Sequence, residues 1–549
     1  MVKQDAPRRS SSRASKRTSQ ISSLKDLTLL DRTKSDTKAD NALGSLLGRD
    51  GSQRGFPDRV YLLAAAIFQK SHAEKPPHHR LVSFGKKTGG LMPEARDNAT
   101  QRCAYDLAFN ALKYQELLED ILIDSCFYLS QPMPDDLMSL VAVMLYDFQD
   151  RKFLPREWPA NEREKQKPEV RQVEQYLLKF KTKLAASLAR CRIKQDLLTI
   201  DCMLPDSVRK KQERASSQPL YAWVNTLKTS LVEVQDLLKR EGFTQVKSPR
   251  QLEGQTFCQD AHCQDLLVFP SQQKAELYQT KLLSQYKLVL QDKSCCMGPW
   301  LAGSVLVGQE GDILMARTPS VATVAHVASI AAGGPRGPGL SGGGPSGTGV
   351  SPCRVYVCAG DLHTCQRAEL QESLSNLGCR NVKLLPEAFQ ALDVNDSHLQ
   401  KTQLILLMPQ CSLSAVCNPV HYLLQENGDT ELLQDLSQGS IAQDKLAALV
   451  ARQDKDLKHA LRFPRVQSVV YCTCSLYPEE NEELVSRVLA TGQEDQDKPP
   501  FSSFTVSRIT DDPAAILRPH YLMFTRRAHR LVAVRHVNNI SAPALSSCC

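Results

Sequence analysis

The second half of the chain alternates between two hydrophobic periods, and this alternation constrains the fold more than any other feature. Short apolar, β-branched runs suited to buried strands are separated by helical patterns. The strand-like runs lie at 313–316, 354–358, 382–385, 403–407 and 466–474, and the helical patterns at 321–331, 366–377, 444–461 and 479–489. Such alternation predicts a doubly wound, largely parallel sheet. We therefore predict a Rossmann-like α/β domain over residues 291–530, with a last strand at 521–524.

Three further regions precede this domain, as expected for a chain of 549 residues. Residues 1–55 are rich in Ser, Lys and Arg with almost no aromatic side chains, which predicts a disordered basic tail. Residues 56–213 carry helical periodicity, and residues 214–290 mix strands and helices in a small α+β, ferredoxin-like subdomain. We also predict a flexible Gly-rich insertion at 333–349 and a C-terminal tail at 531–549.

Within the first two folded regions the pattern is clear enough to place segments. The helical region contains amphipathic segments at 105–126, 137–153 and 173–198. In the small subdomain, strands are predicted at 220–227, 266–269 and 286–290, and a helix at 230–242 that Gly242 ends. The segment 173–198 has a basic face that could contact phosphates, but a charged face is more often simply solvated. Its residues are Lys179, Lys181, Lys183, Arg190, Arg192 and Lys194.

Composition places the protein in a broad class without fixing a function. The net charge of +8 permits contact with a polyanion but is not a strong nucleic-acid signature. No run reaches the roughly 18–20 apolar residues of a membrane span. The polar N-terminus lacks the apolar core of a signal peptide. We therefore expect the 18 cysteines to be reduced thiols in an intracellular protein, cytoplasmic or nuclear, without membrane contact.

The stretch Val466–Val488 contains the strongest candidate for chemistry. A buried strand ends there in a polar Thr-Cys-Ser turn around Cys474, and Pro478 with four nearby glutamates opens a helix. Ligands of an open α/β sheet lie at the carboxyl ends of its strands. A thiol at Cys474 is therefore placed to act as a nucleophile. A second apolar strand ends shortly before Cys411, and two strand-end thiols of one sheet could face one cleft.

A third strand-end group is Asp361, which follows the strand at 354–358. An acid at this point of a nucleotide-binding fold commonly binds ribose hydroxyls, although Asp361 could equally cap the following helix. Both thiols also have a plain structural interpretation, because a free Cys is most often a small buried hydrophobe.

Other cysteine groups give weaker signals. Cys258, His262 and Cys263 resemble metal ligands, but no fourth ligand completes the set, so we predict no metal site. The terminal pair Cys548–Cys549 could be prenylated, but no polybasic run precedes it.

The strand-end residues resemble a known family. The turn Thr473–Ser475, followed by Pro478–Glu482 (Pro-Glu-Glu-Asn-Glu), is similar to the signature of the Sun-domain (NOL/NOP/Sun) RNA cytosine-5 methyltransferases. Agreement extends, in the family's order, to Pro219–Thr226, Gln291–Ser294 and Cys411-Ser412, and covers residues 214–530. The helical extension in front is similar to that of a divergent branch of this family.

The resemblance implies a Rossmann-like, S-adenosylmethionine (SAM)-dependent methyltransferase fold and a covalent mechanism on RNA. The thiolate of Cys474 would add to C6 of a cytosine, so that C5 can take the methyl group of SAM, and Cys411 would assist release. Asp361 would hold the ribose of the cofactor. The target cytosine would be unstacked, in single-stranded or unpaired RNA.

Two departures from the family pattern bear on activity. The family carries Asp-Ala-Pro-Cys before the second thiol, whereas this chain has Met408-Pro-Gln-Cys411. The family's cofactor loop, Ala-Ala-Pro-Gly-Gly-Lys-Thr, should fall on Thr318–Val324, which lacks the glycines and the lysine. Losing one well-placed electrostatic group typically costs roughly 10²–10³ in rate. Two hypotheses follow: a methyltransferase with weak SAM affinity, or a catalytically weak or inactive RNA-binding or scaffold protein on the same fold. A protein partner is compatible with either.

Overall fold

The structure is a computed structural model, and it describes residues 55–74, 82–85, 98–130, 133–157, 167–306, 311–317, 320–333, 353–426, 428, 430–491, 502–506 and 520–525. The predicted basic tail, Gly-rich insertion and C-terminal tail with Cys548–Cys549 lie outside these residues, apart from Gly55 and Gly333. The domain boundaries given above remain predictions.

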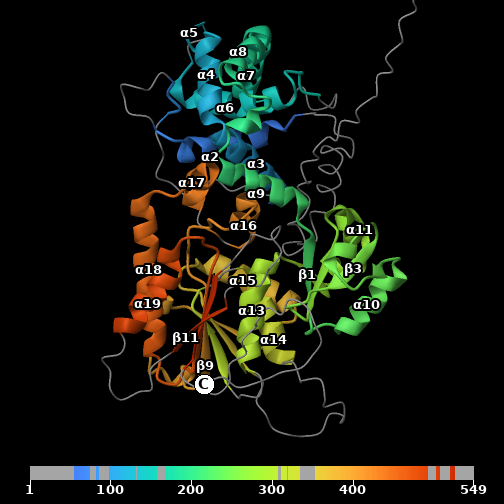
Figure 1. Cartoon of the computed structure of the whole chain (residues 1–549), viewed down its shortest axis with the longest axis vertical. Helices are drawn as coiled ribbons and strands as arrows, with labels where there is room; N and C mark the ends of the chain where they lie inside the picture. The colour runs from blue at the N-terminus through green and yellow to red at the C-terminus, as the bar shows by residue number, and fades with distance from the viewer. Residues whose placement is uncertain are drawn as a thin grey trace, which may run out of the picture.

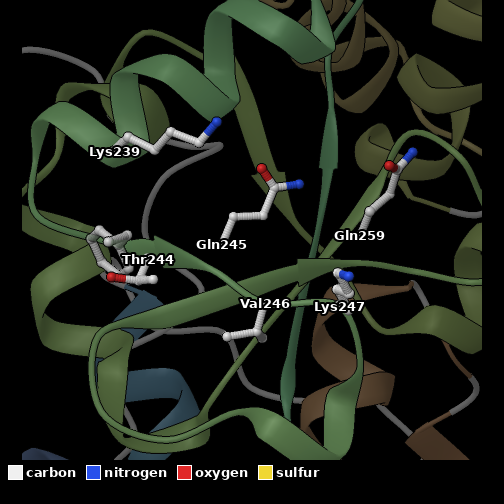
Figure 2. A pocket seen from close by; sticks show the side chains of 7 residues that line it. Lys239, Thr244, Gln245, Val246, Lys247 and Gln259 are labelled. Carbon is white, nitrogen blue, oxygen red and sulfur yellow. The ribbon is translucent and has the colours of Figure 1, made fainter.

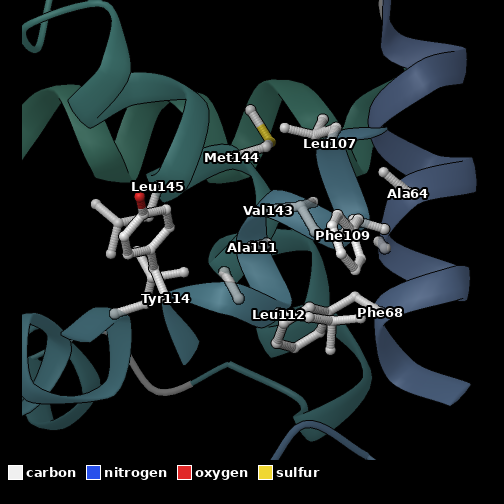
Figure 3. Packing of buried hydrophobic residues seen from close by; sticks show 14 of the residues in the cluster. Ala64, Phe68, Leu107, Phe109, Ala111, Leu112, Tyr114, Val143, Met144 and Leu145 are labelled. Atoms are coloured by element: carbon white, nitrogen blue, oxygen red, sulfur yellow. The ribbon is translucent and has the colours of Figure 1, made fainter. Parts of the chain in front are cut away.

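The first described region is helical, as its periodicity predicts, and lies at the top of Figure 1. Its helices share one hydrophobic core, and Figure 3 shows this core where side chains of α2 (Asp58–Ser71), α3 (Asn98–Lys113) and α6 (Asp135–Asp150) pack together. The helices are α2 (Asp58–Ser71), α3 (Asn98–Lys113), α4 (Gln115–Asp124), α5 (Phe127–Ser130), α6 (Asp135–Asp150), α7 (Pro168–Lys179), α8 (Lys181–Lys194) and α9 (Asp206–Ser217).

Two segments predicted as continuous in this region are broken. The segment 105–126 breaks at Tyr114, between α3 and α4, where φ is −110° and the phenol donates to Asp201 Oδ1 at 2.6 Å. The segment 173–198 breaks at Phe180, between α7 and α8. The hydrophobic pattern continues across both breaks because the helices on either side bury residues in the same core.

A five-stranded sheet follows, in the order β2-β3-β4-β1-β5. It contains β1 (Leu220–Val224), β2 (Thr244–Gln245), β3 (Thr256–Gln259), β4 (Leu266–Phe269) and β5 (Leu288–Leu290), with helices α10 (Leu231–Arg240), α11 (Lys274–Gln279) and α12 (Lys281–Ser284). The sequence did not predict β2 and β3. Strand β1 ends three residues earlier than predicted, because the Asn225 side chain turns away to donate to Tyr286 O and Leu377 O. Helix α10 ends as predicted before Gly242, whose φ is +92°.

The second sheet has seven strands in the order β11-β12-β10-β9-β6-β7-β8. The strands are β6 (Asp312–Met315), β7 (Val355–Cys358), β8 (Val382–Leu385), β9 (Thr402–Leu407), β10 (Ser468–Thr473), β11 (Ser502–Val506) and β12 (His520–Thr525). Strands β6 to β10 are parallel, while β12 pairs antiparallel with β10 and with β11. The predicted doubly wound, Rossmann-like α/β sheet is therefore observed.

Helices cover both faces of this sheet (Figure 1). On one face lie α13 (Lys293–Leu306), α14 (Val321–Gly333) and α15 (Thr364–Asn376), and on the other α18 (Gln443–Arg462) and α19 (Glu482–Thr491). Successive strand residues alternate between the two cores: Leu404 and Leu406 pack toward α13 and α14, and Ile405 and Leu407 toward α18. Both faces of each central strand are buried, which explains the continuous apolar runs of the sequence.

Two short helices join the helical region to the sheet. Helices α16 (Pro419–Gln425) and α17 (Leu433–Gln438) lie between them in Figure 1, and both pack on α3. Their buried residues, including Val420, Leu423 and Leu436, belong to the hydrophobic core of the helical region. Within the described residues, no helix has the length and apolar character that a membrane crossing requires.

Candidate active site

The two predicted thiols come together at one edge of the sheet. Strands β9 and β10 are parallel neighbours, so their carboxyl ends lie side by side, and Cys411 and Cys474 follow those ends. The Cys474 backbone N–H donates to Cys411 Sγ at 3.3 Å, and the Cys474 carbonyl accepts from Ala415 N at 3.0 Å. Thus two turns that are distant in sequence are joined directly at the thiols.

The Cys474 thiol faces a side chain that the sequence did not single out. Its Sγ donates to the Tyr422 hydroxyl of α16 at 3.4 Å. The pKa of Cys474 is raised to about 11, chiefly by burial; the hydrogen bond to Tyr422 lowers it and the nearby carboxylates raise it, and both effects are included in that value. A reactive cysteine usually has a lowered pKa and a cation nearby. In this conformation Cys474 is therefore a neutral thiol near pH 7.

The second thiol is neutral as well. Cys411 is buried, and burial raises its pKa well above the ordinary value, with smaller contributions in the same direction from Cys474 and Glu480. A protonated thiol can donate a proton but is a poor nucleophile. Because Cys411 is buried whereas Cys474 is partly exposed, Cys411 is the better suited of the two to proton transfer and Cys474 to attack.

Only part of the acid cluster after Cys474 lies where predicted: Glu482 and Glu483 are in the first turn of α19, whereas Glu479 and Glu480 precede the helix. Pro478–Glu480 forms a short 3₁₀ turn, and α19 begins only at Glu482, because Asn481 leaves helical geometry with φ −120° and ψ −108°. Glu480 is fully buried instead of lying along the helix dipole. Its carboxylate accepts from Ser412 N at 3.0 and 3.2 Å and from Gln453 Nε2 at 2.8 Å. Through these hydrogen bonds, Glu480 links the turn that contains Cys411 to the turn that contains Cys474.

Hydroxyl groups complete this connection. Ser412 Oγ lies 3.0 Å from both Ser475 Oγ and Ser414 Oγ and can donate its single proton to either, and the Leu476 amide donates to Ser414 Oγ at 2.8 Å. These three serines lie in the two turns that carry the thiols. The relative position of the thiols is thus fixed by a polar network as well as by the sheet.

Met408 occupies the position where the resembling family carries an acid. The residue follows β9 directly and is half-buried against the hydrophobic core on the α13 face. Its Sδ lies 3.7 Å from the point where a Cβ on Gly298 of α13 would be. The side chain is therefore in apolar packing and cannot donate a proton or support charge on a substrate.

Asp361 lies at the carboxyl end of β7, as predicted. Its side chain is 65% exposed, and its Oδ2 is 3.5 Å from Arg317 Nη2, at the end of the neighbouring strand β6. Just before it, Gly360 permits close contact of two backbone segments, since a Cβ there would lie 2.1 Å from Ala388 N. An exposed acid at this edge fits the sugar of a nucleoside cofactor.

The other end of the expected cofactor site, where the amino-acid part of SAM would lie, is formed by the start of α14 and by Glu426. Helix α14 begins after Ser320, whose Oγ accepts from Thr323 N at 3.0 Å as an N-cap. The Thr323 hydroxyl donates to Glu426 Oε2 at 3.0 Å, and Gln291 Nε2 donates to Glu426 Oε1 at 2.8 Å. Burial raises the pKa of Glu426, while the hydrogen bonds from Ser320, Gln291 and Thr323 lower it.

The contacts of Glu426 determine whether the amino-acid end of SAM fits at the start of α14. The start of the helix after the first strand attracts anions, and the carboxylate of an amino-acid-bearing cofactor would suit it. Here the Glu426 carboxylate already lies against the first turn of that helix through the Thr323 hydroxyl, and Gln291, its other donor, is itself held by Trp223 Nε1 at 2.9 Å. The residues fit the sugar of SAM but not its amino-acid end in this conformation.

The remaining predicted groups lie apart from the thiols. His262 Nδ1 contacts Lys293 Nζ at 2.9 Å and Cys263 donates to Met297 Sδ at 3.4 Å, and no metal-binding cluster is found among the described residues. The basic helices α7 and α8 carry exposed lysines, and Arg190 pairs with Asp124. An open hollow of about 740 Å³ lies at the edge of the small sheet, lined in part by Lys239, Gln245 and Lys247 (Figure 2), and contains none of the strand-end residues.

Comparison with known proteins identifies the family. The model of the NOL1/NOP2/Sun domain family member 5 ferredoxin-like domain matches residues 218–291. The methyltransferase-family protein NSUN7 of Homo sapiens is 44% identical over 79% of this chain, which spans 58% of that relative. A 28S rRNA (cytosine-C(5))-methyltransferase of Mus musculus is 29% identical over 57% of this chain and 60% of its own length.

Among solved structures, a methyltransferase homolog protein from Pyrococcus horikoshii aligns at 15% identity with a TM-score of 0.37, over 58% of this chain and 88% of its own. The fold assignment rests on the sheet topology described above, not on that alignment. The sequence relatives agree with the strand-end motifs and with their order along the chain. The chain belongs to the NOL1/NOP2/Sun-domain methyltransferase family.

Proposed function

We propose that the protein is an RNA cytosine-5 methyltransferase in which Cys474 forms the covalent bond to the base and Cys411 assists release. One observation carries the proposal: the thiols at the ends of β9 and β10 lie together, with the Cys474 amide 3.3 Å from Cys411 Sγ. The names of relatives that methylate rRNA cytosines support RNA as the substrate.

The covalent step is carried by the chain's own side chains. Cys474 loses its proton to solvent, its sulfur bonds to C6 of the cytosine, and the C5=C6 electron pair moves into the ring, which makes C5 nucleophilic. For release, solvent takes the proton from C5, the C5=C6 double bond re-forms and the sulfur–C6 bond breaks. Cys411, a protonated thiol, is placed to donate a proton to the departing sulfur of Cys474. SAM supplies the methyl group in this family, and its amino-acid end does not fit the site while Glu426 fills it.

The substrate is inferred to be an unpaired cytosine. C6 of a stacked and paired base is out of reach of a thiol in a turn, so the base must leave its stack. Proteins recognise RNA bases mainly in single-stranded loops, bulges and ends. A cytoplasmic or nuclear location is part of the proposal, and no disulfide joins the described cysteines.

Covalent trapping tests the proposal. Cys411→Ala, incubated with SAM and an unstructured cytosine-containing RNA, should accumulate a protein–RNA adduct on a denaturing gel, because release is impaired. The adduct should vanish when Cys474→Ala is added. Cys417→Ala, which removes another buried thiol of the same loop, is the matched control and should form no adduct. Absence of adduct from Cys411→Ala, both alone and combined with Glu426→Gln, would contradict the proposal.

A second candidate function is favoured by two specific observations. Met408 packs in an apolar environment where an acid is expected, and the pKa of Cys474 is raised instead of lowered. Both favour a catalytically weak or inactive RNA-binding or scaffold protein on the same fold. That function predicts RNA binding in a filter assay together with no detectable calorimetric signal for SAM at millimolar concentration, in the wild type and in Glu426→Gln.

A further inference from the structure

Helix α16 reaches both halves of the candidate active site. It begins at Pro419, after Asn418 caps it by accepting from His421 N at 3.1 Å, and Glu426 follows its last residue. Tyr422 and Glu426 are four residues apart, a spacing that places two side chains on one side of a helix. Tyr422 contacts the Cys474 thiol, and Glu426 contacts Thr323 and Gln291.

The position of Glu426 is chemically specific. The first N–H groups of a helix have no partners within the helix and carry a positive partial charge. An anionic ligand group therefore binds there readily, and in an open α/β sheet ligands lie at this edge. Glu426 is 7% exposed and places its own carboxylate against the first turn of α14. A second carboxylate could approach only by displacing the first or by overcoming its charge.

The helical region holds α16 in this place. Pro419, Val420 and Leu423 are buried, and α16 packs on α3. At its other end Gln425 Nε2 donates to Leu290 O in β5 at 3.2 Å. The helix is thus fixed from two sides, by the core of the helical region and by the small sheet, and its contacts with the site do not depend on a single side chain.

We propose that α16 is an internal plug, which covers Cys474 with Tyr422 and fills the amino-acid end of the cofactor site with Glu426. SAM then binds only when α16 leaves its place or when the charge of Glu426 is removed. The plug inference rests on the proposed function, because α16 would regulate the same active site. It adds a closed state of that site. In this state the protein retains both thiols and excludes the cofactor.

Calorimetry on the full chain tests the plug. SAM is titrated into the wild type, Glu426→Gln and the double variant Tyr422→Ala with Glu426→Ala. Glu483→Gln is the matched control, because it removes an exposed carboxylate from α19. The two site variants should bind SAM at least about tenfold more tightly than the wild type and the control, which is about 1.4 kcal/mol. Thermal unfolding of each variant verifies that it is folded.

Two results would overturn the plug. One is equal SAM affinity of the wild type and Glu426→Gln. The other is absence of binding in every folded variant, since the cofactor would then be excluded by the altered loop and not by α16. Trapping reports separately on the proposed function: tighter SAM binding in Glu426→Gln with no trapped RNA retains the plug and rejects the methyltransferase. Trapped RNA together with unchanged SAM affinity of Glu426→Gln retains the methyltransferase and rejects the plug.

Discussion

Replacing Glu480 with Ala should loosen the turns that hold the two thiols. The carboxylate is fully buried and accepts from Ser412 N at 3.0 and 3.2 Å and from Gln453 Nε2 at 2.8 Å. Gln453 Nε2 keeps another acceptor, Gln410 O at 2.8 Å, whereas the Ser412 amide loses its acceptor. The substitution therefore leaves one buried donor without a partner and a second one with half of its hydrogen bonds.

The size of the effect follows from these contacts. A buried donor left unsatisfied costs about 1–3 kcal/mol, and the partial loss at Gln453 together with the cavity brings the total to about 2–4 kcal/mol. For a domain of this size, 1 kcal/mol corresponds to roughly 2–4 °C in the unfolding midpoint, so Glu480→Ala should lower it by roughly 4–16 °C. Glu480→Gln keeps an acceptor for Ser412 and should cost clearly less.

The measurement is thermal unfolding followed by circular dichroism, with Glu483→Ala as control, because Glu483 lies exposed in the first turn of α19. Peptide-level alkylation of Cys411 below the midpoint adds a local readout, since the loosened turn should make this buried thiol accessible. A midpoint for Glu480→Ala within about 2 °C of the wild type would refute the assignment of Glu480 as the link between the two turns.

The remaining predictions concern the Cys474 thiol and Gly360, which lies next to Asp361 at the expected cofactor site. Because the thiolate is the reactive form and burial raises the pKa of Cys474 to about 11, its alkylation rate should rise about tenfold per pH unit from pH 7 to 10. Peptide mass spectrometry measures this rate, and a plateau below about pH 9 would contradict the raised pKa. Gly360→Ala would place a Cβ 2.1 Å from Ala388 N and should destabilise the fold by about 1–3 kcal/mol. Thermal unfolding measures this as a lower midpoint, and an unchanged midpoint would contradict the close backbone contact at Gly360.

The strand-end part of the site could be predicted because the geometry of a parallel sheet is regular. Apolar runs of fixed period give the strands, and parallel neighbours necessarily end at the same edge. The positions of Cys411, Cys474 and Asp361 at that edge follow from the sequence in this way. The predicted bounds of β4 and β8 also agree with the structure.

The groups around the thiols could not be predicted, since none of them follows from local pattern. Glu480 lies in an acidic run that suggests a helix start, and only the backbone break at Asn481 directs it inward. Tyr422 lies in a helix of seven residues and Glu426 directly follows it, and their i, i+4 spacing was the one available signal. Packing on α3, more than 300 residues upstream, fixes that helix, and no local rule contains such a contact.

The core that α16 and α17 share with the helical region also bears on how the protein folds. The thiols are 63 residues apart, and the intervening chain leaves the sheet, joins a core built largely from residues 60–208, and returns as β10. Contacts between segments so distant in sequence form slowly, because the chain loses conformational entropy on closing the loop before the favourable contacts are made. During synthesis the helical region is made first and can fold first. The folded helical region then provides the surface on which α16 and α17 pack, so the two turns that carry the thiols should be among the last parts of the molecule to form.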